Sequence, residues 1–429
     1  MFWRPVPVVL TAVTVLAGAV GCASGGPEPA ATPGTPERAA TSGPSQRAAA
    51  PDCTKAGPRD FDGDGRDDVA VGNRMLSGGQ VSLLTAGRLV RLTIQDEAAD
   101  AVGSSVALAR VDADGCADLV VGAPYTKVDG KGGAGAVYVL YGGGTRPHRK
   151  LVAPEPQENA RFGSSVAAYG GTIAVGAPLE KERGARAAGA VYVFPEGATG
   201  ARRISQETEG VPGNSEVGDR FGHALALGPL PDGRLRLLVG APDERKDGTG
   251  RQLGHGGAGH TGSVTLIDEV RAERYQALKF DGASEECAYG AAVAHLPGDR
   301  WAVTAPRCGT LQVNGTSGPV RTVSCQACAG SQALSALAVS PDGRLAVAWG
   351  DSAVVLVPDD EEGVRDQVVP TLPGGNWPVA FYGSKLVFGR PRDTPPLTVT
   401  VHDPATGTSE EVAIEGGPGD VEGVGEALG

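Results

Sequence analysis

Acidic residues are concentrated in one short stretch, where the nine positions from Asp60 to Asp68 hold five aspartates. Four of them stand at positions 1, 3, 5 and 9 of a nine-residue loop: Asp60, Asp62, Asp64 and Asp68. Calcium takes about six to eight oxygen ligands, which carboxylates on a tightly curled loop can supply. Gly63 and Gly65 permit the positive φ angles that such a curl requires. The spacing therefore predicts a calcium site, called here the first acidic loop.

The first acidic loop has two other interpretations, an EF-hand and a solvated acidic turn. An EF-hand would need a glutamate at position 12 and a following helix. Val71 stands at that position, inside an apolar run typical of a strand, so the EF-hand interpretation fails. The remaining alternative is a solvated acidic turn that holds no ion.

A weaker copy, the second acidic loop, runs from Arg110 to Asp118. Asp112, Asp114 and Asp118 keep positions 3, 5 and 9, but Arg110 replaces the first aspartate. This change removes one oxygen ligand and adds a positive charge. Either calcium still binds here, or the Arg110 guanidinium neutralises the carboxylates directly.

The other residues that could do chemistry form no catalytic constellation. A Gly-x-Ser-x-Gly nucleophile motif is absent from the sequence. The glycine-rich stretch 130–135 precedes an expected strand, whereas a phosphate-binding loop follows a strand and opens a helix, so we interpret it as a surface loop. His255 and His260 lie five residues apart with no third ligand evident, and Asn314 begins a glycosylation sequon by pattern only.

One unit recurs along the chain and must position these loops. Its first part, an aromatic or apolar residue followed by glycine and a small-residue strand, occurs at 102–107, 162–167, 221–226 and 289–294. Its second part, a β-branched strand ending in Gly-Ala-Pro, occurs at 119–124, 173–178 and 237–242, with eroded copies at 301–306 and 386–391. Each unit predicts a small antiparallel sheet that cannot bury both faces alone, so the sheets should stack radially and share a core.

Phe-Gly followed by Gly-Ala-Pro resembles the FG-GAP repeat, found in the β-propeller of integrin α subunits and in many bacterial surface proteins. The match is specific over about residues 100–310. The resemblance implies an all-β β-propeller over residues 52–429. Seven blades are expected, because seven second strands end at Gly72, Gly122, Gly176, Gly240, Ala305, Gly350 and Gly389. The resemblance also implies that the position-7 carbonyls of Arg66 and Cys116 complete the two calcium loops. In this family the calcium sites are structural and lie on the face opposite the ligand-binding face.

The first unit lacks a Phe-Gly strand before Asp60, whereas the segment Val424–Gly429 looks like such a strand with nothing after it. We therefore expect the C-terminus to supply the innermost strand of the first blade. Closure of this kind removes exposed sheet edges.

The N-terminus has the features of a targeting segment. Residues 1–22 combine Arg4 with a short apolar run and end in Ala-Val-Gly-Cys, which resembles the bacterial lipobox, although Ala19 stands where leucine is usual. Cys22 would then be lipidated; simple secretion is the alternative. Residues 23–51, rich in Ala, Pro, Gly, Ser and Thr, are interpreted as a flexible tether. This layout predicts a monomeric head on the outer face of a bacterial membrane.

Six cysteines remain after Cys22: Cys53, Cys116, Cys287, Cys308, Cys325 and Cys328. An even number in an exported chain favours disulfides. Sequence does not choose among the 15 pairings that six cysteines allow. The preferred set is Cys287–Cys308, Cys325–Cys328 and Cys53–Cys116, and a zinc site at Cys325 and Cys328 is less favoured because a second ligand pair is missing.

The loops after each Gly-Ala-Pro are polar and variable in length, and in the integrin propeller the equivalent loops help to form the ligand-facing rim. The candidate rim residues are Tyr125, Lys127, Asp129, Glu180, Arg183, Asp243 and Arg245. A net charge of −12 argues against nucleic acid as the partner. We expect a non-catalytic, calcium-binding adhesion module for a protein or glycan. The alternative is a propeller-type hydrolase or lyase acting on a cell-envelope or extracellular substrate.

Overall fold

The computed structural model describes most of the chain after residue 50. The described residues are 51–73, 79–144, 146–197, 200–245, 259–315, 318–324, 336–349, 352–357, 365–369, 378–389, 398–413 and 427–428. They belong to one compact unit, Ala50–Gly429. The predicted signal peptide with Cys22, the tether, His255, Cys325 and Cys328 lie outside the described residues.

The described residues form seven four-stranded antiparallel sheets. Sheet 1 contains β28 (Ala427–Leu428), β1 (Val69–Asn73), β2 (Gln80–Thr85) and β3 (Arg88–Leu92). Sheet 2 contains β4 (Ser105–Ala109), β5 (Asp118–Ala123), β6 (Ala136–Leu140) and β7 (Arg149–Leu151). Sheet 3 contains β8 (Ser165–Tyr169), β9 (Thr172–Ala177), β10 (Ala190–Phe194) and β11 (Arg202–Ile204). Sheet 4 contains β12 (Ala224–Pro229), β13 (Leu235–Ala241), β14 (Ser263–Asp268) and β15 (Gln276–Asp281).

The C-terminal half follows the same pattern. Sheet 5 contains β16 (Val293–Leu296), β17 (Arg300–Ala305), β18 (Thr310–Gly315) and β19 (Gly318–Ser324). Sheet 6 contains β20 (Leu337–Val339), β21 (Leu345–Trp349), β22 (Ser352–Val357) and β23 (Arg365–Val369). Sheet 7 contains β24 (Val379–Tyr382), β25 (Lys385–Gly389), β26 (Thr398–Asp403) and β27 (Thr408–Ala413). The helical elements among the described residues are two 3-10 turns, η1 (Cys53–Lys55) and η2 (Pro306–Cys308).

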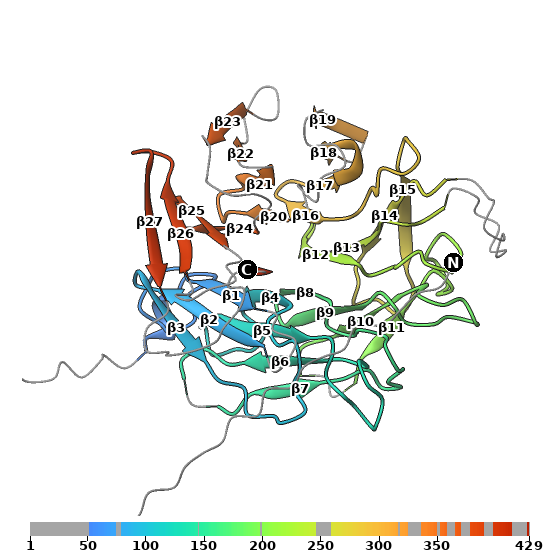
Figure 1. The fold of residues 1–429 in the computed structure, drawn as a ribbon, viewed down its shortest axis with the longest axis horizontal. Coiled ribbons are helices and arrows are strands. Elements are labelled where there is room, and N and C mark those ends of the chain that lie inside the picture. The colour runs from blue at the N-terminus through green and yellow to red at the C-terminus, as the bar shows by residue number, and fades with distance from the viewer. Residues whose placement is uncertain are drawn as a thin grey trace, which may run out of the picture. The chain divides into compact units, whose positions relative to one another are not determined.

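Within this unit the sheets follow one another around a common centre, with the first strand of each sheet innermost and the last outermost (Figure 1). The chain is therefore an all-β β-propeller. Each hydrophobic core lies between two neighbouring sheets. One cluster, for example, joins Val120 and Val139 of sheet 2 to Phe162, Val175 and Tyr192 around sheet 3. Because each hydrophobic cluster is shared by two sheets, the sheets stabilise one another, as the repeat pattern predicts.

The glycines of the repeat mark the junctions between successive sheets. A Cβ at Gly122, at the end of β5, would lie 2.0 Å from the carbonyl oxygen of Gly163 in the next unit. The same relation joins Gly176 to Gly222 and Gly240 to Gly290, each at 2.1 Å. The glycine of each Gly-Ala-Pro thus packs directly against the glycine carbonyl of the next Phe-Gly, which occupies the place of a Cβ. Only glycine allows this approach.

Sheet 1 also packs against the last sheet. Val71 and Leu84 of sheet 1 share a hydrophobic cluster with Ala380, Val387 and Val399 of sheet 7. The C-terminal strand β28 pairs antiparallel with β1, placing Leu428 opposite Val71 and Ala427 opposite Gly72. The rest of the predicted C-terminal strand lies outside the described residues.

Candidate metal centre

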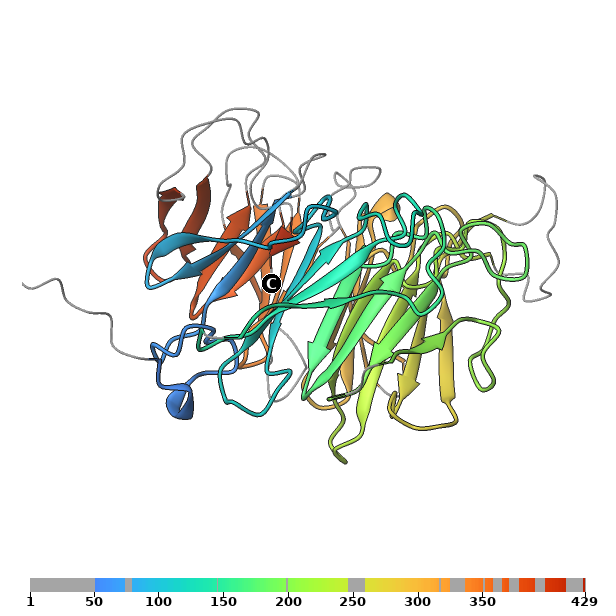
Figure 2. The ribbon, with the colours of Figure 1, turned by 90° about the horizontal axis from the view of Figure 1, so that it is seen from below.

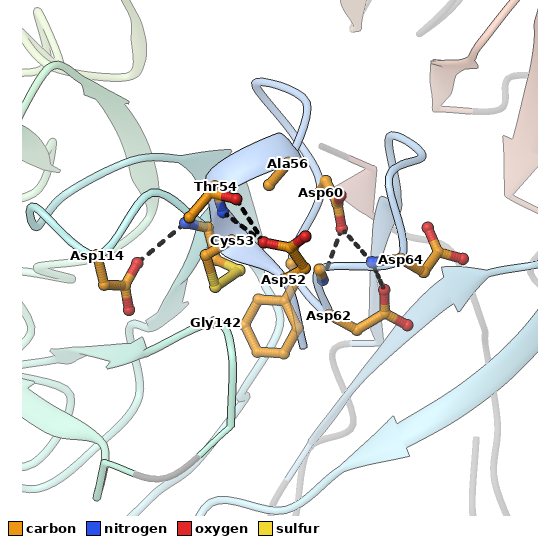
Figure 3. Close-up of a disulfide and its surroundings, with 12 residues drawn as sticks. Asp52, Cys53, Thr54, Ala56, Asp60, Asp62, Asp64, Asp114 and Gly142 are labelled. Atoms are coloured by element: carbon orange, nitrogen blue, oxygen red, sulfur yellow. Dashed lines mark hydrogen bonds between the residues drawn. A yellow bond between two sulfur atoms is a disulfide. The ribbon is translucent and has the colours of Figure 1, made fainter. Parts of the chain in front are cut away.

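The first acidic loop connects η1 to β1 and is curled around its first aspartate. Asp60 is fully buried; its Oδ1 accepts the N–H groups of Gly63 at 2.7 Å and Asp64 at 3.2 Å, and its Oδ2 accepts that of Gly65 at 2.8 Å. Gly63 and Gly65 have φ values of 73° and 87°, as the curl requires. Figure 3 shows Asp60, Asp62 and Asp64 beside the Cys53–Cys116 disulfide.

Three carboxylates converge inside this loop. Oxygen atoms of Asp60, Asp62 and Asp68 lie within 4.8 Å of one another. The hydroxyl of Thr85, at the end of β2, donates to Asp62 Oδ2 at 2.8 Å. Asp64 is not one of the three, and the predicted role of the Arg66 carbonyl stays a prediction.

Asp68 carries the clearest mark of a cation site. Its Oδ2 accepts the Phe61 N–H at 2.8 Å, whereas its Oδ1 is buried and has no hydrogen-bond partner. Burial raises the pKa of Asp68 to about 7, and the nearby Asp62 and Asp60 charges add to this effect. A buried, unpartnered oxygen among three acids is costly unless a cation is bound. The residues therefore fit calcium, which Asp60, Asp62 and Asp68 would hold.

The first acidic loop and the residue before it are hydrogen-bonded to two other sheets. The Ala117 N–H donates to the Asp60 carbonyl at 2.8 Å, and the Gly143 N–H donates to the Phe61 carbonyl at 2.9 Å. These two donors flank β5 and β6 of sheet 2. Arg59, which immediately precedes the loop, donates to the Val339 carbonyl on β20 of sheet 6 at 2.7 Å. The loop thus contacts sheet 2, and the residue before it contacts sheet 6, which lies beyond sheet 7.

The second acidic loop also brings its carboxylates together, since oxygens of Asp112, Asp114 and Asp118 lie within 4.8 Å of one another. The predicted alternative, in which Arg110 neutralises these acids, is wrong. The Arg110 guanidinium donates instead to the Ala56 carbonyl at 2.6 Å and to the Gly57 carbonyl at 3.2 Å, beside η1. Arg146, which the sequence analysis missed, forms the ion pair with Asp112.

Two of the predicted disulfides are present, Cys53–Cys116 and Cys287–Cys308. The first links the η1 turn to position 7 of the second acidic loop and so fastens the two loops together. The Cys116 carbonyl as a calcium ligand stays a prediction.

The candidate rim residues lie at the other end of the same strands. β5, for example, begins at the second acidic loop and ends beside Tyr125, so the two sets of loops occupy opposite faces. In the edge-on view of Figure 2, the dark-blue η1 segment lies on the lower side of the sheets. Tyr125, Lys127 and Asp129 are exposed.

The remaining rim candidates differ in their contacts. Arg183 is exposed and forms an ion pair with Glu207. Asp243 is partly buried between Arg220 and Arg307. Arg245 is half-buried and bridges to His260 through the backbone.

Glu180 is the one rim prediction that the structure contradicts. Its side chain is buried, its Oε2 accepts the Tyr192 hydroxyl at 2.8 Å, and its Oε1 accepts Arg203 Nε at 2.7 Å. A ligand cannot reach a carboxylate enclosed in this way. Burial raises the pKa of Glu180, while the Arg203 charge opposes the rise. Its role is to hold two strands of sheet 3.

Equivalent acids, one half-buried and one buried, recur beside the neighbouring sheets. In sheet 2, Asp96 accepts the Tyr138 hydroxyl and Lys150 Nζ, each at 2.8 Å. In sheet 4, Glu244 accepts Lys279 Nζ at 2.6 Å. In all three sheets the acid pairs with a cation on the outermost strand: Arg203, Lys150 or Lys279. Sequence spacing does not reveal these pairs, because the acids do not all come from equivalent loops.

Models of the FG-GAP repeat match this chain at residues 55–84 and 102–140, and a second FG-GAP repeat model matches residues 147–194. Integrin alpha-PS2 of Drosophila melanogaster is 33% identical over 211 residues, which are 42% of this chain and 14% of the integrin. Integrin alpha-3 of Mus musculus is 33% identical over 155 residues, 32% of this chain and 14% of that protein. The alignments thus span about a seventh of these relatives.

Solved structures resemble the fold at low sequence identity. A protein titled a putative 6-phosphogluconolactonase, from Bacteroides uniformis, matches with a TM-score of 0.53 and 13% identity, over 83% of this chain and 98% of that one. A second, from Bacteroides fragilis, matches with a TM-score of 0.52 and 14% identity, over 84% and 97%. These likenesses bear on the fold alone. In the part of the chain that the structure describes, no helix is long and apolar enough to cross a bilayer.

Proposed function

Because the chain carries FG-GAP repeats and an integrin-α-like propeller, we propose that it is a non-catalytic binding module that works outside the cytoplasm. Lipid on Cys22 would hold it to the membrane, and residues 23–51 would act as the tether. Calcium would occupy the first acidic loop, and a protein or glycan would bind the opposite rim. The resemblance to enzymes rests on fold alone and adds no catalytic role.

The buried, unpartnered Asp68 oxygen is the observation that supports calcium. When bound, the ion supplies positive charge that offsets three converging carboxylates. The chain's own residues do the rest: backbone N–H groups fix Asp60, Thr85 orients Asp62, and Phe61 holds the second oxygen of Asp68. Bound calcium would therefore stabilise the fold.

The same location supports ring closure as part of the proposal. The first acidic loop leads directly into β1, the strand that pairs with β28. A seven-bladed ring closed by the C-terminal strand would place the calcium at the seam between the two ends of the chain. Deleting Val424–Gly429 should then lower the melting temperature of the whole head, and an unchanged melting temperature would contradict this part.

A group of exposed side chains supports the rim as the binding surface. Tyr125, Leu179 and Val217 are 37%, 37% and 41% exposed, on three loops of one face. Arg161 stacks 3.6 Å above the Tyr125 ring. The loops adjoin, because the Leu179 N–H donates to the Ala160 carbonyl at 3.2 Å. Together they offer apolar and cationic contact area, the composition that interfaces favour. We name Tyr125, Arg161, Leu179 and Val217 the rim patch.

The test is binding of the lipid-free secreted chain to a glycan array and to cell-envelope proteins, with calcium and with chelator. Tyr125→Ala should reduce capture about tenfold or more, since buried aromatic anchors dominate interfaces. The matched control is Tyr169→Ala, because Tyr169 is 44% exposed but lies at the β8–β9 turn on the acidic-loop face. Equal loss of capture in both variants would refute the rim as the binding surface.

A further inference from the structure

The two acidic loops differ in what neutralises them. In the second acidic loop, Arg146 forms an ion pair with Asp112 Oδ2. The guanidinium is also held 3.9 Å above the Tyr141 ring. In the first acidic loop, the hydrogen bonds to Asp60, Asp62 and Asp68 that the structure describes come from backbone N–H groups and the Thr85 hydroxyl.

The ninth position shows the same contrast. Asp118 has both oxygens satisfied, since Oδ2 accepts the Val111 N–H at 2.8 Å and Oδ1 accepts the Gly142 N–H at 3.0 Å. Asp68 has only its Oδ2 satisfied and keeps a buried oxygen without a partner. A carboxylate with both oxygens hydrogen-bonded gains less from a cation than one with a free oxygen.

The difference originates in the connection between the third and fourth strands of each sheet. In sheet 1 this connection is a tight turn, with Thr85 paired directly to Arg88, and it contributes only the Thr85 hydroxyl. In sheet 2 the connection runs from residue 141 to 148, and it supplies both the Gly142 N–H and the Arg146 guanidinium. The longer connection in sheet 2 therefore places the Arg146 guanidinium against the second acidic loop.

Position 1 reinforces this assignment. Arg110 offers no oxygen, and its guanidinium is engaged with the Ala56 and Gly57 carbonyls. The second acidic loop consequently lacks the fully buried first carboxylate around which the first loop is curled. Three carboxylates remain, and a fixed positive charge lies on one of them.

We infer that Arg146 is a built-in substitute for the metal ion in the second acidic loop, so that the chain binds calcium at the first acidic loop alone. The part of the inference that concerns calcium at the first acidic loop rests on the proposed function. The replacement of a calcium ion by the Arg146 guanidinium concerns the second acidic loop only. Arg146 thereby determines how many ions the propeller takes.

The test uses the full-length mature chain, CaCl₂ as the probe, and two readouts: calorimetric stoichiometry and melting temperature in calcium and in chelator. Wild type should bind one ion, Asp62→Asn should lose it, and Asp112→Asn should leave it in place. Arg146→Gln should melt below wild type in chelator, recover on adding calcium, and show a second binding event. The matched control is Arg161→Gln, which also removes a guanidinium stacked on a tyrosine, on the opposite face.

Two results would overturn the inference. One is a wild-type protein that binds two ions and loses one of them in Asp112→Asn, a result that does not depend on how well Arg146→Gln folds. The other is an Arg146→Gln protein whose response to calcium equals that of Arg161→Gln. Failure of the proposed function looks different: wild type would bind no calcium, while a response gained only in Arg146→Gln would still support the substitution.

Discussion

The glycine at the end of each Gly-Ala-Pro strand gives a sharp test of how the sheets join. In Gly176→Ala, the new methyl carbon would lie 2.1 Å from the Gly222 carbonyl oxygen and 2.2 Å from Ser165 Oγ, far inside van der Waals contact. Neither neighbour can move freely. The Ser165 hydroxyl donates to that same carbonyl at 2.7 Å, and the Gly222 N–H donates to the Gly240 carbonyl at 3.2 Å.

The cost follows from these contacts. Overpacking a tight site costs about 1–3 kcal/mol, and displacing the carbonyl would lose about one hydrogen bond, worth about 1 kcal/mol. The total is about 2–4 kcal/mol. For a head of about 380 residues, the entropy of unfolding is about 0.8 kcal/mol/K, so the melting temperature should fall by about 3–5 °C.

Differential scanning calorimetry measures this shift against Gly132→Ala. Gly132 has open space where a Cβ would be and no positive φ, so its substitution should change stability by less than about 0.5 kcal/mol. If Gly176→Ala melts within 1 °C of Gly132→Ala (a margin of about 1 kcal/mol), the Phe-Gly carbonyl does not need a glycine opposite it, and this account of the repeat fails.

Three further perturbations probe other parts of the head. Replacing Cys53 and Cys116 by serine opens a loop with a sequence separation of 63 residues and should cost about 4 kcal/mol in urea denaturation; an unchanged midpoint would contradict the role of this link. Burial, together with nearby carboxylates, raises the pKa of Asp219 to about 8, so its stabilising contribution is complete below its unfolded pKa of about 4 and is lost as the pH rises through about 8. Melting curves between pH 5 and 9 should show this decline and should show less of it in Asp219→Asn; equal slopes would refute it. Glu180→Gln should destabilise the head by about 2 kcal/mol because it removes a buried charge that Arg203 pairs with and leaves Arg203 with Glu182 as its remaining carboxylate, whereas Arg183→Gln, at a side chain 72% exposed, should cost less than about 0.5 kcal/mol; similar costs would count against the buried role of Glu180.

The sequence was most informative where one physical constraint recurs. Glycine at 122, 176 and 240 must accept a carbonyl at about 2 Å from its would-be Cβ, so the residue type repeats wherever two sheets join. The apolar runs that end at these glycines form the buried second strands. The acidic spacing predicted that Asp60, Asp62 and Asp68 meet, but it also predicted Asp64, which is not one of the three.

Partners supplied by distant segments could not be predicted. Arg146 comes 28 residues after Asp118, on a connection whose length alone decides that it reaches the loop. Neutralisation of the nearby acids by Arg110 is one of the two alternatives that the sequence leaves open, but its guanidinium donates instead to main-chain carbonyls beside η1. The position of Glu180 after Gly-Ala-Pro predicts a rim residue, yet a tyrosine and an arginine from the third and fourth strands enclose it.

If calcium in the first acidic loop stabilises the propeller, the melting temperature of the full-length chain should rise as calcium is titrated. At a calcium concentration about a hundred times Kd, binding adds about 2.7 kcal/mol, which corresponds to about 3 °C for this head. We expect that rise in wild type and its absence in Asp62→Asn. A wild-type melting temperature that is the same in chelator and in saturating calcium would contradict this stabilisation.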